Sequence, residues 1–167
     1  MTSSEHGREG GLGYGFALAG FASFFYVALV VCVFGVLSLL LDQDVVPERD
    51  AGPVLGPASV AACVLALLIA MITLAARPAV THVVGPSVLT GVVVSALYVV
   101  VGAALYGLGA NDPAAILGWL LAHVSTAFTI AIGVVAAVVQ SLFLLVLARH
   151  DAGGRRPRWG WEGDERE

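Results

Sequence analysis

Six residues between positions 123 and 140 form a candidate functional site. Spacings of 3, 3, 4, 4 and 3 place them on one face of an α-helix. They are His123, Thr126, Thr129, Gly133, Ala137 and Gln140. One interpretation is a polar lining for a small-solute path, because imidazole, hydroxyl and amide groups can hydrogen-bond a neutral solute. The other is a helix-packing seam, because small residues let a second helix approach closely and hydroxyls can bond across the contact.

Other chemical signatures are missing from the sequence. It contains no HExxH or GxSxG motif, and the two cysteines, Cys32 and Cys63, belong to no CxxC pair. The long apolar stretches contain no Asp or Glu, although ion-coupled carriers usually place a carboxylate near the membrane midplane. We therefore expect no enzymatic activity, no metal site and no cofactor.

The distribution of charge predicts the secondary structure in which these residues lie. Of 167 residues, 59% are hydrophobic and 12% are charged. The stretches without any Asp, Glu, Lys or Arg are 10–41, 51–76, 78–111 and 113–148. Each is longer than the ~20 residues that cross a bilayer as a helix. The sequence therefore predicts an all-α integral membrane four-helix bundle. The same charge distribution argues against a soluble enzyme and against a nucleic-acid-binding protein.

The predicted organisation has three parts. An N-terminal segment covers 1–15, a transmembrane domain covers 16–148, and a tail covers 149–167. The predicted spans are 16–41, 57–76, 83–107 and 117–147. The sequence leaves open whether the fourth span is one tilted helix or a broken one.

The arginines predict the orientation of the chain. With four spans, both termini share one side of the membrane with the loop after the second span. Seven of the eight arginines lie on that side, and Arg49 alone lies on the other. The positive-inside rule then places both termini in the cytoplasm, in a multi-pass protein of the cell (inner) membrane.

A basic and aromatic segment follows the last span at a short distance. Its residues are Arg155, Arg156, Arg158, Trp159 and Trp161. Arginine attracts anionic headgroups and tryptophan prefers the membrane interface, so we interpret this segment as a lipid-surface anchor. A docking peptide for a cytoplasmic partner is the alternative.

The loop after the first span carries a family resemblance. The stretches 38–47 and 50–57 resemble an uncharacterised family, a domain of unknown function, of small four-span membrane proteins from high-GC Gram-positive bacteria. The resemblance implies no activity, cofactor or catalytic residue. It makes a set of loop residues candidates for a structural re-entry turn: Asp42, Asp44, Asp50, Gly52, Pro53, Gly56 and Pro57.

Together these observations predict a non-enzymatic structural or accessory membrane subunit that acts through helix–helix packing. Its expected partners are the lipid bilayer and either further copies of itself or another membrane protein, with no nucleic acid. The alternative is an oligomeric small-solute transporter or channel that uses the polar face of the fourth span.

Overall fold

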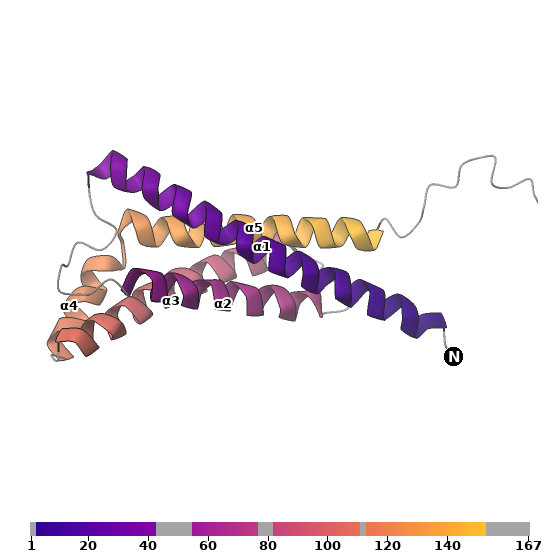
Figure 1. Ribbon diagram of the computed structural model, residues 1–167, viewed down its shortest axis with the longest axis horizontal. Coiled ribbons are helices and arrows are strands. Elements are labelled where there is room, and N and C mark those ends of the chain that lie inside the picture. Colours follow the sequence, from indigo (N-terminus) through magenta and orange to yellow (C-terminus); the bar gives the residue numbers. More distant parts are fainter. Residues whose placement is uncertain (1–2, 43–54, 77–81, 111–112, 153–167) are drawn as a thin grey trace, which may run out of the picture.

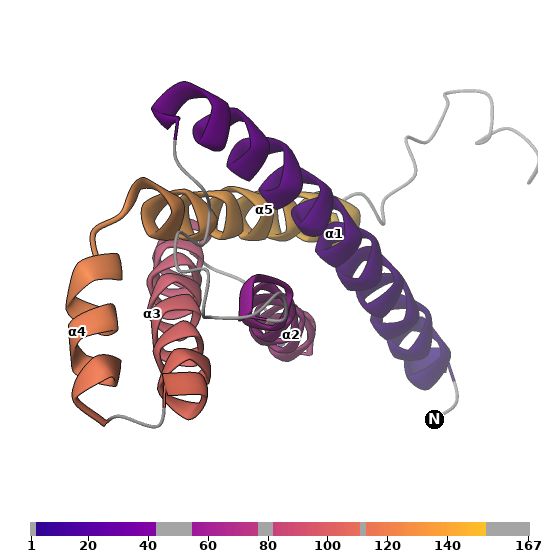
Figure 2. The same ribbon diagram turned by 60° about the vertical axis from the view of Figure 1, so that its left-hand side comes forward.

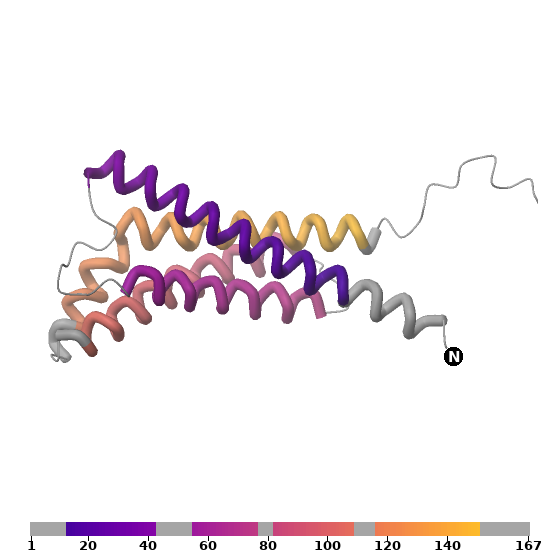
Figure 3. Tube along the Cα trace, in the orientation of Figure 1, coloured from indigo at the N-terminus to yellow at the C-terminus, as the bar shows by residue number. Residues whose placement is uncertain are grey.

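The computed structural model describes residues 3–42, 55–76, 82–110 and 113–152, and within these ranges it contains helices and no strand. Figures 1 and 3 trace five helices along the chain. They are α1 (Ser3–Leu41), α2 (Leu55–Ala75), α3 (Val84–Ala110), α4 (Pro113–His123) and α5 (Ala127–Ala152). The all-helical fold that the sequence predicts is therefore confirmed.

Four of these helices are long and apolar enough to cross a membrane. The apolar segments are Gly13–Leu41, Leu55–Ala75, Val84–Leu108 and Ala127–His150. Large apolar side chains also cover the outside of the molecule, for example Phe24, Leu65 and Val134. A helix that is apolar on all sides suits a bundle that packs against protein on one face and lipid on the other.

The first helix is the least covered of the four spans. In Figures 1 and 2, α1 crosses the bundle obliquely, and its end diverges from α5. In an 18-residue apolar stretch of α1, 17% of the residues are buried, against 44% in the corresponding stretch of α5. Most of the surface of α1 is therefore available to lipid or to another helix. Asp42, the residue after the end of α1, has a φ of 48°.

The structure decides a point that the sequence leaves open, namely whether the predicted fourth span is one helix or a broken one. Instead of one helix over 117–147, it has the short helix α4, a break at 124–126, and the long helix α5. The apolar stretch is longer than one crossing needs, and Ser and Thr at the break favour helix caps over helix interiors. Figure 2 places α4 beside α3, so the surplus residues lie against the outside of that helix.

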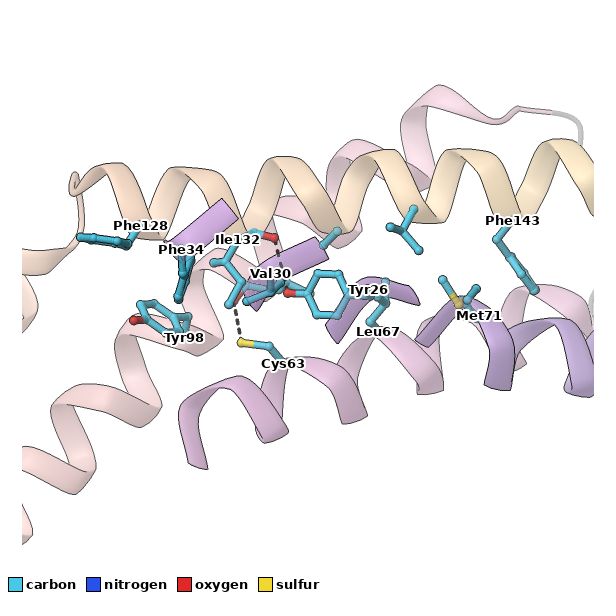
Figure 4. Close-up of a cluster of buried hydrophobic side chains, with 14 of the residues drawn as sticks. Tyr26, Val30, Phe34, Cys63, Leu67, Met71, Tyr98, Phe128, Ile132 and Phe143 are labelled. Atoms are coloured by element: carbon cyan, nitrogen blue, oxygen red, sulfur yellow. Dashed lines mark hydrogen bonds between the residues drawn. The ribbon is translucent and has the colours of Figure 1, made fainter. Parts of the chain in front are cut away.

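Hydrogen bonds join the four long helices at one level, which we call the hydrogen-bonded layer. The Tyr26 hydroxyl of α1 donates to the carbonyl oxygen of Ile132 at 3.4 Å. The Cys63 thiol of α2 donates to the carbonyl oxygen of Val94 at 3.5 Å. The Ser95 hydroxyl of α3 donates to the carbonyl oxygen of Thr129 at 3.1 Å. Figure 4 shows the apolar side chains that surround Tyr26 and Cys63.

Other hydroxyl groups bond within their own helices. Each donates to the carbonyl oxygen four residues earlier, at 2.8 to 2.9 Å. They are Ser23, Ser59, Ser87 and Thr90. A hydroxyl that is satisfied in this way does not leave an open polar group in the core. The hydroxyl side chains in the interior therefore add few unpaired polar groups to a core that is mainly apolar.

Candidate functional site

The candidate site begins at the break between α4 and α5, where a threonine starts the second helix. The hydroxyl oxygen of Thr126 accepts a hydrogen bond from the backbone N–H of Thr129 at 3.3 Å. The carbonyl oxygen of Thr126 accepts from the N–H of Ile130 at 3.1 Å. This is the N-cap arrangement, in which a side chain satisfies an N–H group that the first turn leaves unpaired.

The hydroxyl groups of the same two threonines also bond to the last carbonyl group of α4. The carbonyl oxygen of His123 lies 2.8 Å from the Thr129 hydroxyl oxygen and 3.2 Å from that of Thr126. The two hydroxyl oxygens lie 3.0 Å apart. A carbonyl at a helix end has no partner within its helix, and an unsatisfied one is costly in a membrane. These side chains therefore allow the chain to change direction without an open backbone group.

The His123 ring packs flat on the ring of Trp119. The ring centroids are 3.9 Å apart and the planes differ by 9°. The Nδ1 atom of His123 lies 2.9 Å from the carbonyl oxygen of Trp119. Because a carbonyl only accepts, Nδ1 carries the hydrogen in this contact. The half-buried imidazole is thus held by the last turn of its own helix.

Glycines of α3 receive the large side chains of α4. A Cβ atom on Gly102 would overlap the indole ring of Trp119, and one on Gly107 would overlap Ile116. Tyr106 adds a ring contact with Trp119, with centroids 6.4 Å apart. Sequence analysis missed this contact. The sequence signal for this contact was a pair of glycines five residues apart near the end of the third span, followed by a tryptophan.

Behind the break, α3 and α5 approach closely through small residues. A Cβ atom on Gly91 would lie 2.7 Å from the carbonyl oxygen of Gly133 and 3.0 Å from the Cβ atom of Ala137. A Cβ atom on Gly133 would overlap the hydroxyl group of Ser95. The structure therefore uses Gly133 and Ala137 as packing residues within one chain.

Gln140 lies deeper, on the buried side of α5. Its side chain is completely buried, and neither amide atom has a hydrogen-bond partner among the described residues. At 1.5 Å per residue it lies about 16 Å along the helix from Thr129. Because Gly133 and Ala137 pack against α3 over that distance, the amide is separated from the polar group at the break.

The six predicted residues therefore divide into three groups. His123, Thr126 and Thr129 come together at the helix break, Gly133 and Ala137 form the contact with α3, and Gln140 is isolated in the core. They do not share one continuous helical face, because the helix that the spacing assumed is interrupted between His123 and Ala127.

Aromatic rings fill the space between the helix break and the hydrogen-bonded layer. Phe34 makes edge contacts with Phe128, at a centroid distance of 5.3 Å, and with Tyr98, at 6.1 Å. Figure 4 shows these rings converging from α1, α3 and α5. All three are buried, so this part of the bundle is closed by apolar packing.

The residues of the family-like loop are only partly described. Asp42 directly follows the end of α1, and Gly56 and Pro57 lie in the first turn of α2. Asp44, Asp50, Gly52 and Pro53 lie outside the described residues. The predicted lipid-surface anchor, Arg155, Arg156, Arg158, Trp159 and Trp161, also lies outside them.

The two cysteines have different environments, and neither is in a disulfide. Cys63 is buried in the core, whereas Cys32 is exposed on α1. Among the described residues, no group of three or more His, Cys, Asp or Glu side chains is placed to hold a metal ion.

The length and apolar composition of four helices define an all-helical, multi-pass membrane protein. The chain belongs to the Family of unknown function (DUF6121), whose model matches residues 8–167. Comparison with curated proteins and with solved structures finds no match. Membership agrees with the resemblance to an uncharacterised family and brings no activity with it.

Proposed function

We propose that the protein is a non-enzymatic structural subunit of the bacterial cell (inner) membrane that assembles through helix–helix packing. The observation that carries this proposal is the outward face of α1. We define this face by seven exposed residues at helical spacing: Gly13, Ala17, Gly20, Phe24, Ala28, Val31 and Gly35.

The composition of the outward face suits a second helix better than lipid alone. Five of its seven residues are Gly or Ala, and nothing lies within 4 Å of the Cβ positions of Gly13, Gly20 and Gly35. Small residues at this spacing let two backbones approach, which increases the packing contacts that drive helix association in membranes. Phe24 is 78% exposed in the middle of the face and offers a large side chain to a partner.

The opposite side of α1 is a precedent within the same chain. Gly15 faces the bundle, and a Cβ atom there would lie 3.2 Å from the Cβ atom of Ala75 in α2. Ala19 and Ser23 continue this inward face and are buried. One side of α1 thus already uses small residues for close packing, and the outward face has the same composition without a neighbour among the described residues.

A second copy of this chain is the occupant that we propose. The outward face belongs to one helix, so two α1 helices related by a two-fold axis present identical surfaces to each other. Another membrane protein that binds the same face would give an accessory subunit rather than a homodimer. Cytoplasmic termini and the lipid-surface anchor remain part of the proposal, supported by the arginine distribution.

The transport alternative receives less support from the packing. The polar group at the helix break and the Gln140 amide are separated by the close contact between α3 and α5. The hydroxyls of Ser23, Ser87 and Thr90 are turned to their own helix backbones. A solute path would therefore have to lie between copies of the chain.

Cysteine cross-linking in native membranes tests the proposed assembly. The exposed Cys32 is first replaced by serine, and Ala28→Cys is then introduced on the outward face. Leu65→Cys is the matched control, because Leu65 is 59% exposed on a different span. Mild oxidation should give a covalent dimer with Ala28→Cys and much less with Leu65→Cys.

Purification in mild detergent distinguishes between a second copy of this chain and another membrane protein as the partner. Wild-type protein should migrate as an assembly, and Gly20→Leu should release it as a monomer because the larger side chain keeps the helices apart. Equal cross-linking at positions 28 and 65, together with a monomeric wild type, would overturn the proposal. If a second protein instead co-purifies in a fixed ratio with the wild type and is lost from Gly20→Leu, that result would indicate an accessory subunit and would contradict the homodimer.

A further inference from the structure

An apolar groove lies between α1 and α5 on the outside of the bundle. Its volume is about 310 Å³, and all eight of its lining residues are apolar. Leu18, Phe21 and Phe25 line it from α1, and Val139, Leu142 and Val146 line it from α5. The groove is separate from the outward face of α1, because its residues lie on the side of α1 that is turned towards α5.

The groove leads to a pair of rings at one end. Tyr14 lies one turn before Leu18, and His150 lies one turn after Val146. Their rings stack with centroids 4.0 Å apart and planes 11° apart. Arg149, which precedes His150, is exposed at the same end of α5. The apolar groove therefore ends beside a basic residue.

We propose that this groove binds one acyl chain of an anionic phospholipid, with the phosphate of the headgroup at Arg149. The first argument is length. From Val139 to His150, α5 rises about 16 Å, and one leaflet contributes about half of the ~30 Å hydrocarbon core. The groove and the ring pair thus extend over the depth of a single leaflet.

The second argument is the order of chemistry along the groove. A phospholipid is apolar along its chain and negatively charged at the end that reaches the interface. The groove has the matching order, because its lining is apolar and Arg149 lies beside the ring pair at its end. Arginine binds phosphate through parallel N–H···O hydrogen bonds, and basic residues at a membrane surface attract anionic lipids. By the arginine distribution, this is a lipid of the cytoplasmic leaflet.

Lipid binding to the full-length protein in detergent tests the proposal. Phosphatidylglycerol and phosphatidylcholine are added separately, and bound lipids are counted from the mass of the intact complexes. The variant Val146→Phe fills the groove, and Val138→Phe is its control, because Val138 is an exposed residue of α5 outside the groove. Arg149→Gln removes the charge and leaves the groove open.

The wild type and Val138→Phe should retain one tightly bound phosphatidylglycerol, and Val146→Phe should lose it. Arg149→Gln should weaken binding about fivefold, which is the effect of one basic residue at an anionic surface. Helix content and monodispersity, measured for every variant, establish that each is folded. Equal binding to the Val146→Phe and Val138→Phe variants would overturn the proposal, and so would equal binding of the two lipids by the wild type.

Discussion

Gly91 of α3 and Gly133 of α5 face each other where the two helices cross. A Cβ atom on Gly91 would lie 2.7 Å from the carbonyl oxygen of Gly133, which is shorter than van der Waals contact permits. Ser95 lies beside the same crossing and bonds to the carbonyl oxygen of Thr129. The pair of glycines therefore sets the distance at which α3 and α5 pack.

Replacing Gly91 by alanine should destabilise the bundle. The added methyl group meets a backbone carbonyl, so a helix rather than a flexible side chain must move. Overpacking of this kind costs about 1–3 kcal/mol. Thermal unfolding in detergent, followed by circular dichroism, checks the expectation. Gly85→Ala is the control: nothing lies within 4 Å of its Cβ position, and its midpoint should not fall. Equal midpoints for the two variants would contradict this account of the crossing.

Removing the cap at the helix break should weaken the start of α5. Thr126→Ala eliminates the acceptor for the N–H of Thr129, and loss of an N-cap typically costs about 0.5–2 kcal/mol. The neighbouring Ser125→Ala is a suitable control, because Ser125 is exposed. The free energy of unfolding in mixed micelles distinguishes the two variants. A larger loss for Ser125→Ala would show that the cap is misassigned.

Replacing Gln140 by leucine should stabilise the isolated chain. Both amide atoms are buried without a partner among the described residues, and such a group costs about 1–3 kcal/mol. Leucine is a similar size and removes the polar atoms, so the unfolding midpoint should rise. Gln140→Glu, which keeps the shape but adds an ionisable group, should lower it. A lower midpoint for leucine would mean that the amide has a water or another polar partner in the membrane.

A methyl group on Gly102 should displace Trp119. The Cβ atom of an alanine would overlap the indole ring, so α4 must shift away from α3. In a background in which Trp159 and Trp161 are replaced by phenylalanine, the fluorescence of Trp119 should move to longer wavelength as its ring becomes exposed. Gly118→Ala, a position with nothing within 4 Å, should leave the emission unchanged. Identical spectra for the two variants would argue against this contact.

The sequence predicts the spanning helices well because their signal is one of composition. Stretches that exclude charged residues must avoid water, and the first three spans end within a few residues of the helices Gly13–Leu41, Leu55–Ala75 and Val84–Leu108. Charge marks such boundaries clearly, since Asp42 and Arg77 lie just beyond the apolar residues of two of them.

The helix break was not predictable from the same signal. The stretch 113–148 has no charge at the break, so composition continues across it. The spacing of His123, Thr126 and Thr129 fits a helical face, yet the hydroxyls are used to end one helix and begin the next. Capping is a short-range competition between side chain and backbone, and threonine is also common inside membrane helices. Residue type alone does not separate these two uses.

The hydrogen-bonded layer has a mechanical consequence. Tyr26, Cys63 and Ser95 tie all four long helices together at one level, whereas packing above and below it is mainly apolar. Dispersion contacts have little directional preference, so the helices can change tilt about this level without losing these bonds. We therefore expect the helices to tilt about the hydrogen-bonded layer. Their tilt from the membrane normal should be larger in a thinner bilayer and smaller in a thicker one. Bilayer thickness would thereby set how far the end of α1 diverges from α5.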